Sequence, residues 1–487
     1  MLNKRLLSLI LAIMMMLSCL LAFASCGKDE EGTITEETDC PKADDDENPN
    51  IPAKDYGGYE FKFLTKEGSS YNTRYIVASD ETGEVLSHYV TERNKAVEEK
   101  YNVKIKQVKV DDIVAKVRSS VLSGVIEYDA ILAAGRELAT MNIEGLLLDL
   151  NTVERFDFTK SYWDKNACEQ LEINGKLYFT NCAMNIHSYG YGMFFNEKLL
   201  SDNGLKTPHE YMAENNWTID TWTMLAKSVS KDLNDDKKMT AADRYGMLSD
   251  HTYASLMSYA SGIRLTAKND EGKPEITLLD DQTKLSTVFS KVNELFMDKN
   301  VCICNRCDHK EAHGYSSTFA YTRYLFTQDY YLFHIDDVTA VKHFMDMDSE
   351  YGIAPLPKYD AAQESYYSMY EPYYNLFALP VLIEDAERTY SIIEDMNYYS
   401  SKMVTPALVD TLLQRKSSRD DDSEESLKIL RDNTVYDVGL CYEIGNVRSA
   451  VFNLNLCEKV DVVRQYQKSQ RTIKMALDAI VERIEKR

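Results

Sequence analysis

Short β-type runs and helix-type runs alternate after residue 58. Residues 83–100 and 111–123 carry apolar side chains at helical spacing. Three β-type runs predict strands at Tyr59–Thr65, Val103–Val110 and Tyr128–Ala133. Strands linked by helical crossovers favour a sheet with parallel pairs, and ligands of such sheets bind beyond the carboxyl ends of the strands. We therefore expect the loops at 66–72 and 135–136 to reach a binding site.

The stretch Glu172–Leu200 joins this α/β segment to a longer second one. It holds two short β-type runs, Lys176–Thr180 and Tyr191–Phe195, on either side of a small polar segment. We interpret it as the first of three hinge crossings between two lobes, with the later crossings at Tyr330–Phe333 and Tyr373–Leu379. The expected fold class is therefore α/β with two lobes and a cleft between them that binds a ligand. The lobe boundaries that follow are 58–185 plus 330–376 for lobe I, and 186–329 plus 377–487 for lobe II.

Residues 216–222 open a helix in the second segment. Thr218 is a suitable N-cap residue. Trp217 and Trp222 then occupy the two positions of a hydrophobic staple, which favours packing over ligand stacking for both rings. At the other end of the chain, the apolar spacing of Thr472–Glu485 predicts a last helix packed on a lobe.

The N-terminus carries an export signal. Lys4 and Arg5 precede an apolar run at Leu6–Ala24, and small residues follow. The sequence Phe-Ala-Ser-Cys at 23–26 resembles a bacterial lipobox. It predicts a lipoprotein signal peptide at 1–25, although the run is also nearly long enough to serve as an uncleaved transmembrane anchor.

The lipobox places a lipid, such as a palmitate chain, on Cys26. The acidic residues 26–57 contain no aromatic side chain before Tyr56 and cannot bury enough apolar surface to fold, so they are expected to be a disordered tether. The rest of the chain should then lie at the outer face of the cell membrane, held to it by the lipid anchor.

Charge and missing motifs exclude several functions. The net charge of -23 and the lack of a basic face argue against nucleic acid as a partner. The chain has no P-loop, dinucleotide-binding fingerprint, nucleophile elbow or zincin motif. Its 33 tyrosines, against 16 phenylalanines, suit polar ring-shaped ligands. No cofactor is required by this interpretation, and the protein is not expected to be an enzyme.

Two segments have the residue types of metal sites. Oxygen ligands at calcium-loop spacing occur at Asp232, Asn234, Asp236, Lys238 (through its carbonyl) and Asp243. Lys237 stands where such a loop usually has glycine, so a solvated acidic turn is the alternative to a structural calcium site. The cysteines at 302–307 lack paired C-x2-C spacing, which favours a disulfide or free thiols over zinc.

The order of several segments resembles the extracellular solute-binding proteins of bacterial ABC transporters, in the family 1 group related to maltodextrin-binding protein. After the lipobox and the acidic tether, the segments that carry the resemblance are GKLYF…YGMFFNEKLL, NWTIDTW, DLNDDKKMTAADRYG, YGIAPLPKYD and SQRTIKMALDAIVERI. The resemblance implies two α/β lobes of the class II type that close around a ligand, and delivery to ABC permease subunits. The segment 300–313 has no counterpart in this family.

A sugar or oligosaccharide is the ligand class that this resemblance suggests. Aromatic faces would stack on the sugar rings, and charged groups would bind hydroxyls. The residues expected to contact it, all in predicted cleft loops or crossings, are Lys66, Tyr71, Arg136, Tyr189, Tyr191, Asp336, Tyr373 and Tyr374. Two alternatives stay open: an exported enzyme acting on polysaccharide with two facing carboxylates, and a surface sensor or adhesion protein on the same fold.

Overall fold

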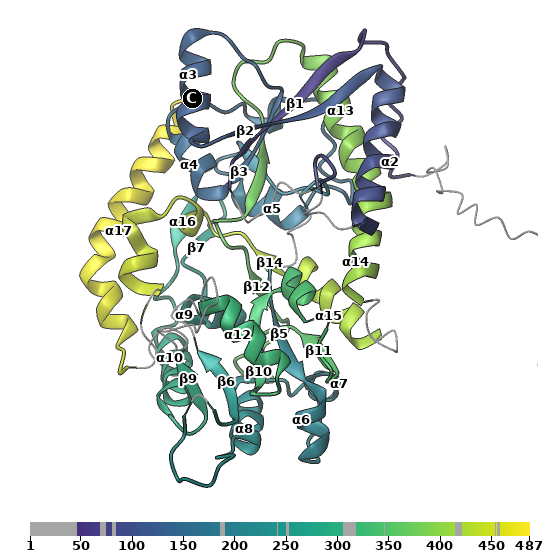
Figure 1. The fold of residues 1–487 in the computed structure, drawn as a ribbon. Coiled ribbons are helices and arrows are strands. Elements are labelled where there is room, and N and C mark those ends of the chain that lie inside the picture. The colour runs from purple at the N-terminus through teal and green to yellow at the C-terminus, as the bar shows by residue number, and fades with distance from the viewer. Residues whose placement is uncertain are drawn as a thin grey trace, which may run out of the picture. The chain divides into compact units, whose positions relative to one another are not determined.

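The alternating runs after residue 58 form a first sheet, with strand order β2-β1-β3-β13-β4 (Figure 1). Its strands are β1 (Tyr59–Lys66), β2 (Val103–Val110), β3 (Ala130–Ala134), β4 (Phe179–Thr180) and β13 (Asn375–Ala378). β1 pairs parallel with β2 and β3, which confirms the predicted parallel pairs. β13 runs antiparallel to β3 and β4.

In the computed structural model, residues 1–48 form one unit and residues 49–487 form a second, compact one. The residues that it describes are 46–68, 75–79, 84–185, 190–240, 242–249, 253–304, 318–344, 346–413, 421–452, 454 and 458–487.

Helices flank the first sheet. They are α2 (Glu84–Tyr101), α3 (Ile113–Ser123), α4 (Gly135–Ile143), α5 (Lys165–Leu171) and α13 (Ala386–Tyr399), with a short 3-10 turn, η2, at Leu150–Thr152. Local sequence sets their ends. Asp112 caps the start of α3 by accepting from the Ala115 amide, and Gly124 ends it at a φ of 70°, which glycine adopts at no steric cost.

A second sheet has the strand order β11-β5-β10-β6-β9. Its strands are β5 (Tyr191–Asn196), β6 (Tyr245–Ser249), β9 (Cys302–Cys304), β10 (Tyr331–Asp337) and β11 (Tyr351–Ala354). β5 is antiparallel to β10 and β11, whereas β6 is parallel to β10 and β9. Both sheets therefore combine parallel and antiparallel pairs.

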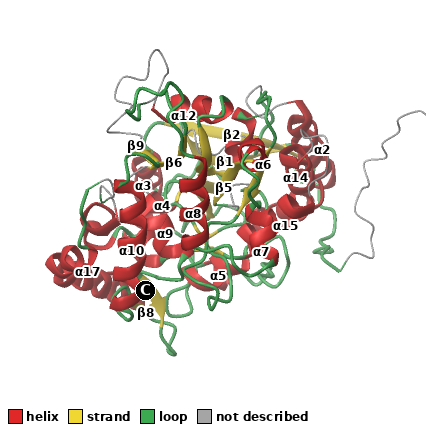
Figure 2. Cartoon of the chain, turned by 90° about the horizontal axis from the view of Figure 1, so that it is seen from below, coloured by secondary structure: helices red, strands yellow, loops and turns green. Residues whose placement is uncertain are grey.

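Helices α6 (Glu197–Asp202), α8 (Ile219–Val229) and α10 (Gln282–Met297) lie around the second sheet (Figure 2). The other helical elements of this region are α7 (Pro208–Ala213), α9 (Tyr253–Ala260), α12 (Thr318–Thr327) and η3 (Val338–His343). Thr218 caps α8 by accepting from the Thr221 amide, and Trp217 and Trp222 are fully buried. The structural interpretation of both tryptophans is thereby confirmed.

The expected second crossing at Tyr330–Phe333 is wrong. β10 is the central strand of the second sheet, paired with β5 on one side and β6 on the other. The segment 330–376, expected in lobe I, therefore contributes β10 and β11 to the second sheet. A buried apolar strand has the same sequence pattern in either sheet, because periodicity reports burial and not the pairing partner.

Short elements connect the two sheets. β12 (Ser368–Met369) pairs with β14 (Thr434–Val435), and β7 (Thr266–Lys268) forms a hairpin with β8 (Pro274–Ile276). After α13 the chain continues through η4 (Ser400–Val404), α14 (Thr405–Leu413), α15 (Asp421–Asp432), α16 (Val438–Cys441), η5 (Ile444–Asn446), η6 (Arg448–Phe452) and α17 (Val462–Glu485). α15 packs on β11 of the second sheet, and α17 contacts both α4 and α10.

Helix α17 starts ten residues before the predicted Thr472. Asp461 caps it by accepting from the Arg464 amide, and Val462 and Tyr466 are buried in its first turns. The apolar spacing did not predict this start, because it is interrupted by the charged residues between Tyr466 and Ile473. These residues lie on the exposed face of a continuous helix.

Asp437 collects five hydrogen bonds where α9, β7 and α16 meet. One carboxylate oxygen accepts from the Tyr259 hydroxyl at 2.7 Å and from the amides of Leu265 and Thr266 at 3.0 and 2.9 Å. The other accepts from the Thr266 hydroxyl at 2.6 Å and the Gly439 amide at 2.8 Å. Asp437 is 3% exposed, so these donors have no alternative partner in water.

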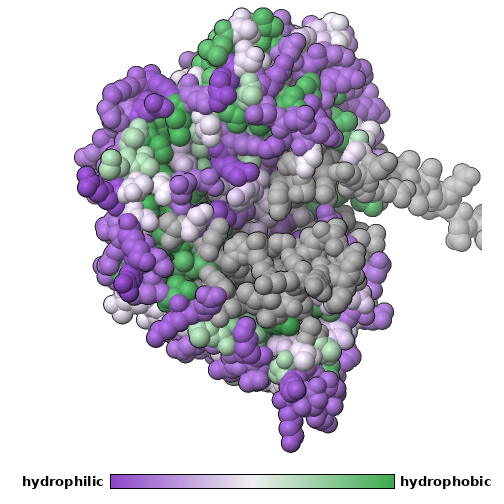
Figure 3. Space-filling model, turned by 60° about the vertical axis from the view of Figure 1, so that its left-hand side comes forward, coloured by the Kyte–Doolittle hydropathy of each residue, from purple (hydrophilic) through white to green (hydrophobic). Residues whose placement is uncertain are grey.

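The apolar core is continuous between the sheets. One cluster of buried side chains contains Phe63 and Phe377 of the first sheet together with Met193 and Phe333 of the second. The face turned forward in Figure 3 is mainly hydrophilic, with small separate apolar patches. Among the described residues, no helix has the length and apolar character needed to cross a bilayer.

Candidate functional site

The strand directions bring particular residues of both sheets to one place. β13 is antiparallel to β3, with Asn375 opposite Ala134, so the residues before β13 meet the residues after β3. In the second sheet Asp337, at the end of β10, lies opposite Tyr191, at the start of β5. The strand ends of the two sheets meet where the ring of Tyr191 stacks on the ring of Tyr374, with the ring centroids 6.4 Å apart.

We call the residues at this contact the junction cluster. Its members are Arg136, Tyr191, Asp337, Glu371, Tyr373, Tyr374 and Arg448.

On the first-sheet side, Tyr373 lies between two guanidinium groups. The guanidinium carbon of Arg136 is 4.1 Å from the centre of the Tyr373 ring, and that of Arg448 is 5.1 Å away. Arg448 also donates two hydrogen bonds, of 2.6 and 3.1 Å, to the carboxylate of Glu371. Burial raises the pKa of Glu371, and the opposing effect of Arg448 does not cancel it.

On the second-sheet side, Asp337 lies beside the two stacked tyrosines. Its carboxylate accepts from the amide of Thr339 at 2.8 Å and from the Thr339 hydroxyl. Burial, and then the charge of Asp337, raises the pKa of Tyr374 well above its usual value, and hydrogen bonds to Asp337 and Tyr191 act in the same direction. Burial raises the pKa of Tyr191 as well, followed by the charges of Glu371 and Asp337. Both phenols therefore stay neutral and serve as hydrogen-bonding groups.

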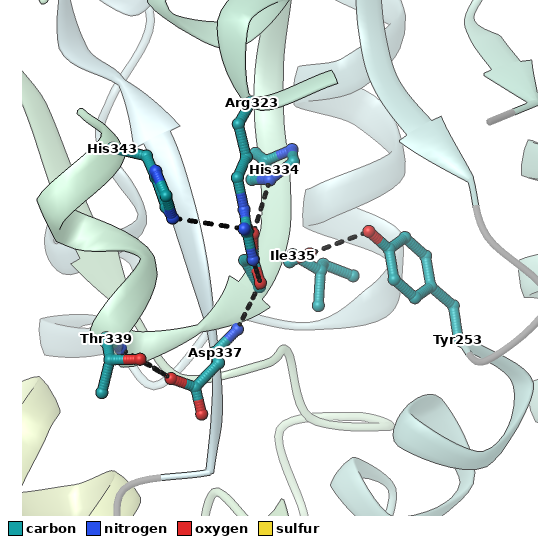
Figure 4. A network of polar contacts seen from close by, with 8 residues as sticks. Tyr253, Arg323, His334, Ile335, Asp337, Thr339 and His343 are labelled. Atoms are coloured by element: carbon teal, nitrogen blue, oxygen red, sulfur yellow. Dashed lines mark hydrogen bonds and ion pairs between the residues drawn. The ribbon is translucent and has the colours of Figure 1, made fainter. Parts of the chain in front are cut away.

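Asp336 contacts Arg323 and His334, which are labelled in the polar network of Figure 4. Arg323 on α12 donates to both of its carboxylate oxygens, at 2.6 and 3.0 Å, and His334 Nε2 lies 3.1 Å from it. Burial opposes its charge, but the hydrogen bonds from His334 and Arg323 hold the pKa of Asp336 below its usual range. Asp336 is 6% exposed and accepts a hydrogen bond from the Asp337 amide at 2.8 Å, so it supports Asp337.

Lys66, at the end of β1, forms an ion pair of 2.7 Å with Glu137 in the first turn of α4. The other carboxylate oxygen of Glu137 accepts from the Ala134 amide at 3.3 Å. Lys66 thus lies next to the start of the helix that carries Arg136, with its charge already paired.

The residues expected to bind ligand therefore separate into groups. Arg136, Tyr191, Tyr373 and Tyr374 come together in the junction cluster, whereas Lys66 and Asp336 lie in ion pairs beside it. Tyr71, Tyr189 and the lipidation residue Cys26 fall outside the described residues.

Sequence reasoning missed Asp337, Glu371 and Arg448 as members of the site. Asp337 follows Asp336 in a strand, so the two side chains point to opposite faces of the sheet. Only the strand register decides which of the two faces the junction cluster. Arg448 is 77 residues from Glu371 in the chain, and no local pattern connects them.

A separate cavity of about 960 Å³ lies elsewhere, and none of the junction residues lines it. Its walls include Tyr162 and Trp163 from the segment before α5, with Arg431 and Asp432 from α15. Both rings are 2% exposed, so little aromatic surface is open for stacking.

Glu394 on α13 holds these two rings. Its carboxylate accepts from the Tyr162 hydroxyl at 2.5 Å and from the Trp163 indole at 3.0 Å, and the Asp157 amide lies 3.3 Å away. Burial raises the pKa of Glu394 to about 7.

The acidic side chains of the candidate calcium loop contact backbone amides. Asp232 accepts from Asn234 and Lys237, Asp236 accepts from Lys238, and Asp243 accepts from Leu233 and Thr240. Within the described ranges, no three His, Cys, Asp or Glu side chains are grouped as metal ligands. The solvated acidic turn explains these contacts, and calcium stays a prediction. Of the cysteines at 302–307, Cys302 is a buried free thiol, and residues 305–317 lie outside the described part.

Comparison with known proteins identifies the family and the fold. A family model described as "Bacterial extracellular solute-binding protein" matches residues 92–370, more than half of the chain. No curated protein matches the sequence.

Solved structures resemble the fold at low sequence identity. An ABC substrate-binding protein from Listeria monocytogenes in complex with cycloalternan is 13% identical, with a TM-score of 0.52 over 87% of this chain and 98% of that one. A sugar transporter protein from Rhizobium etli in an open conformation is 12% identical, with a TM-score of 0.55 and coverage of 88% and 99%. A cyclo/maltodextrin-binding protein complexed with maltotetraose is 15% identical, with a TM-score of 0.52 and coverage of 88% and 98%. The fold is thus the two-lobed arrangement of periplasmic-binding-type proteins.

Proposed function

The chain belongs to the bacterial extracellular solute-binding proteins, and from this we propose that it captures a sugar or oligosaccharide between its lobes for import by an ABC transporter. The junction cluster carries the proposal, because residues at the strand ends of both sheets meet there through Tyr191 and Tyr374. The saccharide ligands named for proteins of the same fold support this ligand class.

The cluster has the groups that saccharide binding needs. Tyr373 is half-buried and offers an aromatic surface for the CH face of a sugar ring. Arg136 and the tyrosine hydroxyls supply donors for ring oxygens and hydroxyls. A ligand that contacts the strand ends of both sheets binds the closed arrangement of the lobes better than the open one. It therefore shifts the population toward the closed arrangement.

The enzyme alternative gains no support from the cluster. A glycosidase needs one carboxylic acid and one carboxylate that are free to face the same sugar bond. Glu371 is held on two atoms by Arg448, and Asp337 accepts from Thr339. Analysis of incubated polysaccharides by chromatography tests this alternative directly, since any shortened product would contradict the proposal.

Thermal-shift screening of the compact unit, residues 49–487, tests the ligand class. The panel contains neutral and acidic saccharides, amino acids and peptides, and a ligand at about 100 times its Kd stabilises the folded state by about 2.7 kcal/mol. We expect a shift with a saccharide. A shift with a peptide or an amino acid and with no saccharide would contradict the proposed ligand class.

Tyr373→Ala links the ligand to the cluster. Loss of the stacking surface should weaken saccharide binding about tenfold, which corresponds to about 1.4 kcal/mol. Tyr211→Ala on α7 is the matched control, because Tyr211 is also half-buried but lies outside the cluster. Equal affinities for the two variants would place the ligand elsewhere.

Membrane attachment through Cys26, with the ABC permease subunits as partners, completes the proposal. Cys26→Ala should move the full-length protein from the membrane to the soluble fraction, because the lipid is the only anchor expected after cleavage. An uncleaved transmembrane anchor would keep this variant in the membrane. A permease encoded next to this protein would favour import over a sensor or adhesion role.

A further inference from the structure

We propose that the captured solute carries a carboxylate, as in a uronic-acid residue of an oligosaccharide, and that Arg136 binds this group. The inference rests on the proposed function, since it names the chemical class of the ligand at the same site.

The cations around the cluster other than Arg136 have carboxylate partners within the chain. On the first-sheet side, Lys66 pairs with Glu137 and Arg448 pairs with Glu371. On the second-sheet side, Arg323 pairs with Asp336, and Asp337 is satisfied by donors from Thr339. On the first-sheet side Arg136 is thus the cation without a carboxylate partner among the described residues, and Glu443 adds a negative charge near Glu371.

Arg136 is the group left without compensation. Its Nε atom is buried and has no hydrogen-bond partner, and no ion pair joins its guanidinium to a described carboxylate. A half-buried charge without a partner is costly, and an anion from the ligand would remove this cost.

The placement of Arg136 leaves the guanidinium edge to act as a donor. The guanidinium carbon lies over the Tyr373 ring, 4.1 Å from its centre, and this contact restricts where the guanidinium can move. A planar fork held in this way matches the two oxygens of a carboxylate. The first amides of α4 cannot take that role, because Gly135 donates to the Tyr374 carbonyl and Arg136 to the Pro372 carbonyl.

The size of the missing charge favours a carboxylate over a phosphate. A single uncompensated cation balances one negative charge, whereas a phosphate monoester carries nearly two at pH 7. The net charge of -23 repels anions at long range, so recognition must come from this local contact.

Isothermal titration calorimetry of the compact unit, residues 49–487, tests the inference. The probes are glucuronic and galacturonic acid with their di- and trisaccharides, and the corresponding neutral glucose and galactose compounds. We expect an acidic compound to bind at least about tenfold more tightly than its neutral counterpart, because a hydrogen bond to a charged group typically contributes that much.

Arg136→Gln should weaken binding of the acidic compound about 10- to 100-fold and change binding of the neutral one less than about threefold. Arg136→Lys keeps the charge but not the fork and should fall between. Arg471→Gln is the matched control, since Arg471 is exposed on α17 and the change in net charge is the same.

The outcomes separate the two levels of the proposal. A neutral saccharide that binds as tightly as its acidic counterpart, or an Arg136→Gln variant with unchanged affinity for the acid, would overturn the carboxylate inference and leave sugar binding intact. Binding of a zwitterionic amino acid in place of any saccharide would overturn the proposed sugar class, and it would overturn the carboxylate inference as well if Arg136→Gln bound that amino acid as tightly as the parent.

Discussion

Removing the Asp437 side chain should destabilise the protein strongly. Asp437→Ala takes the carboxylate acceptor from three buried backbone amides, those of Leu265, Thr266 and Gly439. The amides of Leu265 and Gly439 keep only longer bonds, of 3.4 Å to the Tyr259 hydroxyl and 3.1 Å to the Thr266 hydroxyl. Each orphaned donor costs about 1–3 kcal/mol, while the hydroxyls of Tyr259 and Thr266 can rotate toward other partners. One water in the space left by the carboxylate would recover part of the loss. We therefore expect the free energy of unfolding to fall by about 4 kcal/mol.

Asp437→Asn should cost about half as much. Its amide oxygen can replace the carboxylate oxygen that accepts from Leu265 and Thr266, and the Thr266 hydroxyl can turn to accept from the new amine. Only the Gly439 amide then faces a donor, so we expect a loss of about 2 kcal/mol. Asp461→Ala is the control, because Asp461 is exposed and caps α17 with one side-chain hydrogen bond, a contribution of about 1 kcal/mol.

Urea unfolding followed by tryptophan fluorescence measures all three variants, and the midpoints are compared at equal slope. The expected order of stability is Asp461→Ala, then Asp437→Asn, then Asp437→Ala. If Asp437→Ala lost less than about 1 kcal/mol, the five hydrogen bonds would not hold this corner, and the reasoning from orphaned amides would be refuted.

Three further changes test other parts of the molecule. The pKa of Glu394, about 7 against an ordinary value of 4.5, means that the folded chain keeps a proton that the unfolded chain releases, so stability falls as pH rises through this window. Glu394→Gln has no carboxyl group to titrate here, so it should avoid about 3 kcal/mol of that loss. The unfolding free energy of the variant minus that of the parent should therefore be larger at pH 8 than at pH 5. Equal differences at the two pH values would contradict this prediction. In Gly246→Ala the new Cβ would lie 2.2 Å from the Ala226 carbonyl oxygen, so we expect a loss of about 3 kcal/mol or more, whereas Gly204→Ala, with open space around it, should cost about 1 kcal/mol in the same urea assay. If the loop 232–243 binds calcium, millimolar calcium should raise the Tm of the parent and not of Asp232→Ala; a parent Tm that does not respond to calcium would leave only the acidic turn.

Local pattern predicted the elements of the first sheet well. The strand expected at Val103–Val110 has the same bounds in the structure, and the one expected at Tyr59–Thr65 ends one residue later. The staple of Trp217 and Trp222 was also predictable, because capping and packing depend on residues within one helical turn.

Strand pairing could not be predicted in the same way. Tyr331–Asp337 is buried at every position except Asp337, so its sequence reports a central strand but not the sheet that contains it. The same limit applies to the candidate site. Arg136 and Tyr373 were expected at loops that reach the ligand, but their contact depends on the antiparallel register of β13 and β3, which only the fold determines.

The core shared by Phe63, Phe377, Met193 and Phe333 bears on how this two-lobed protein loses its structure. Domains with separate cores can melt in separate steps, whereas a continuous core couples them. Calorimetry should therefore show one heat-absorption peak instead of two. Neither lobe is expected to survive as an independent fragment after cleavage of the chain between the sheets, since each half would expose apolar surface that the other now covers.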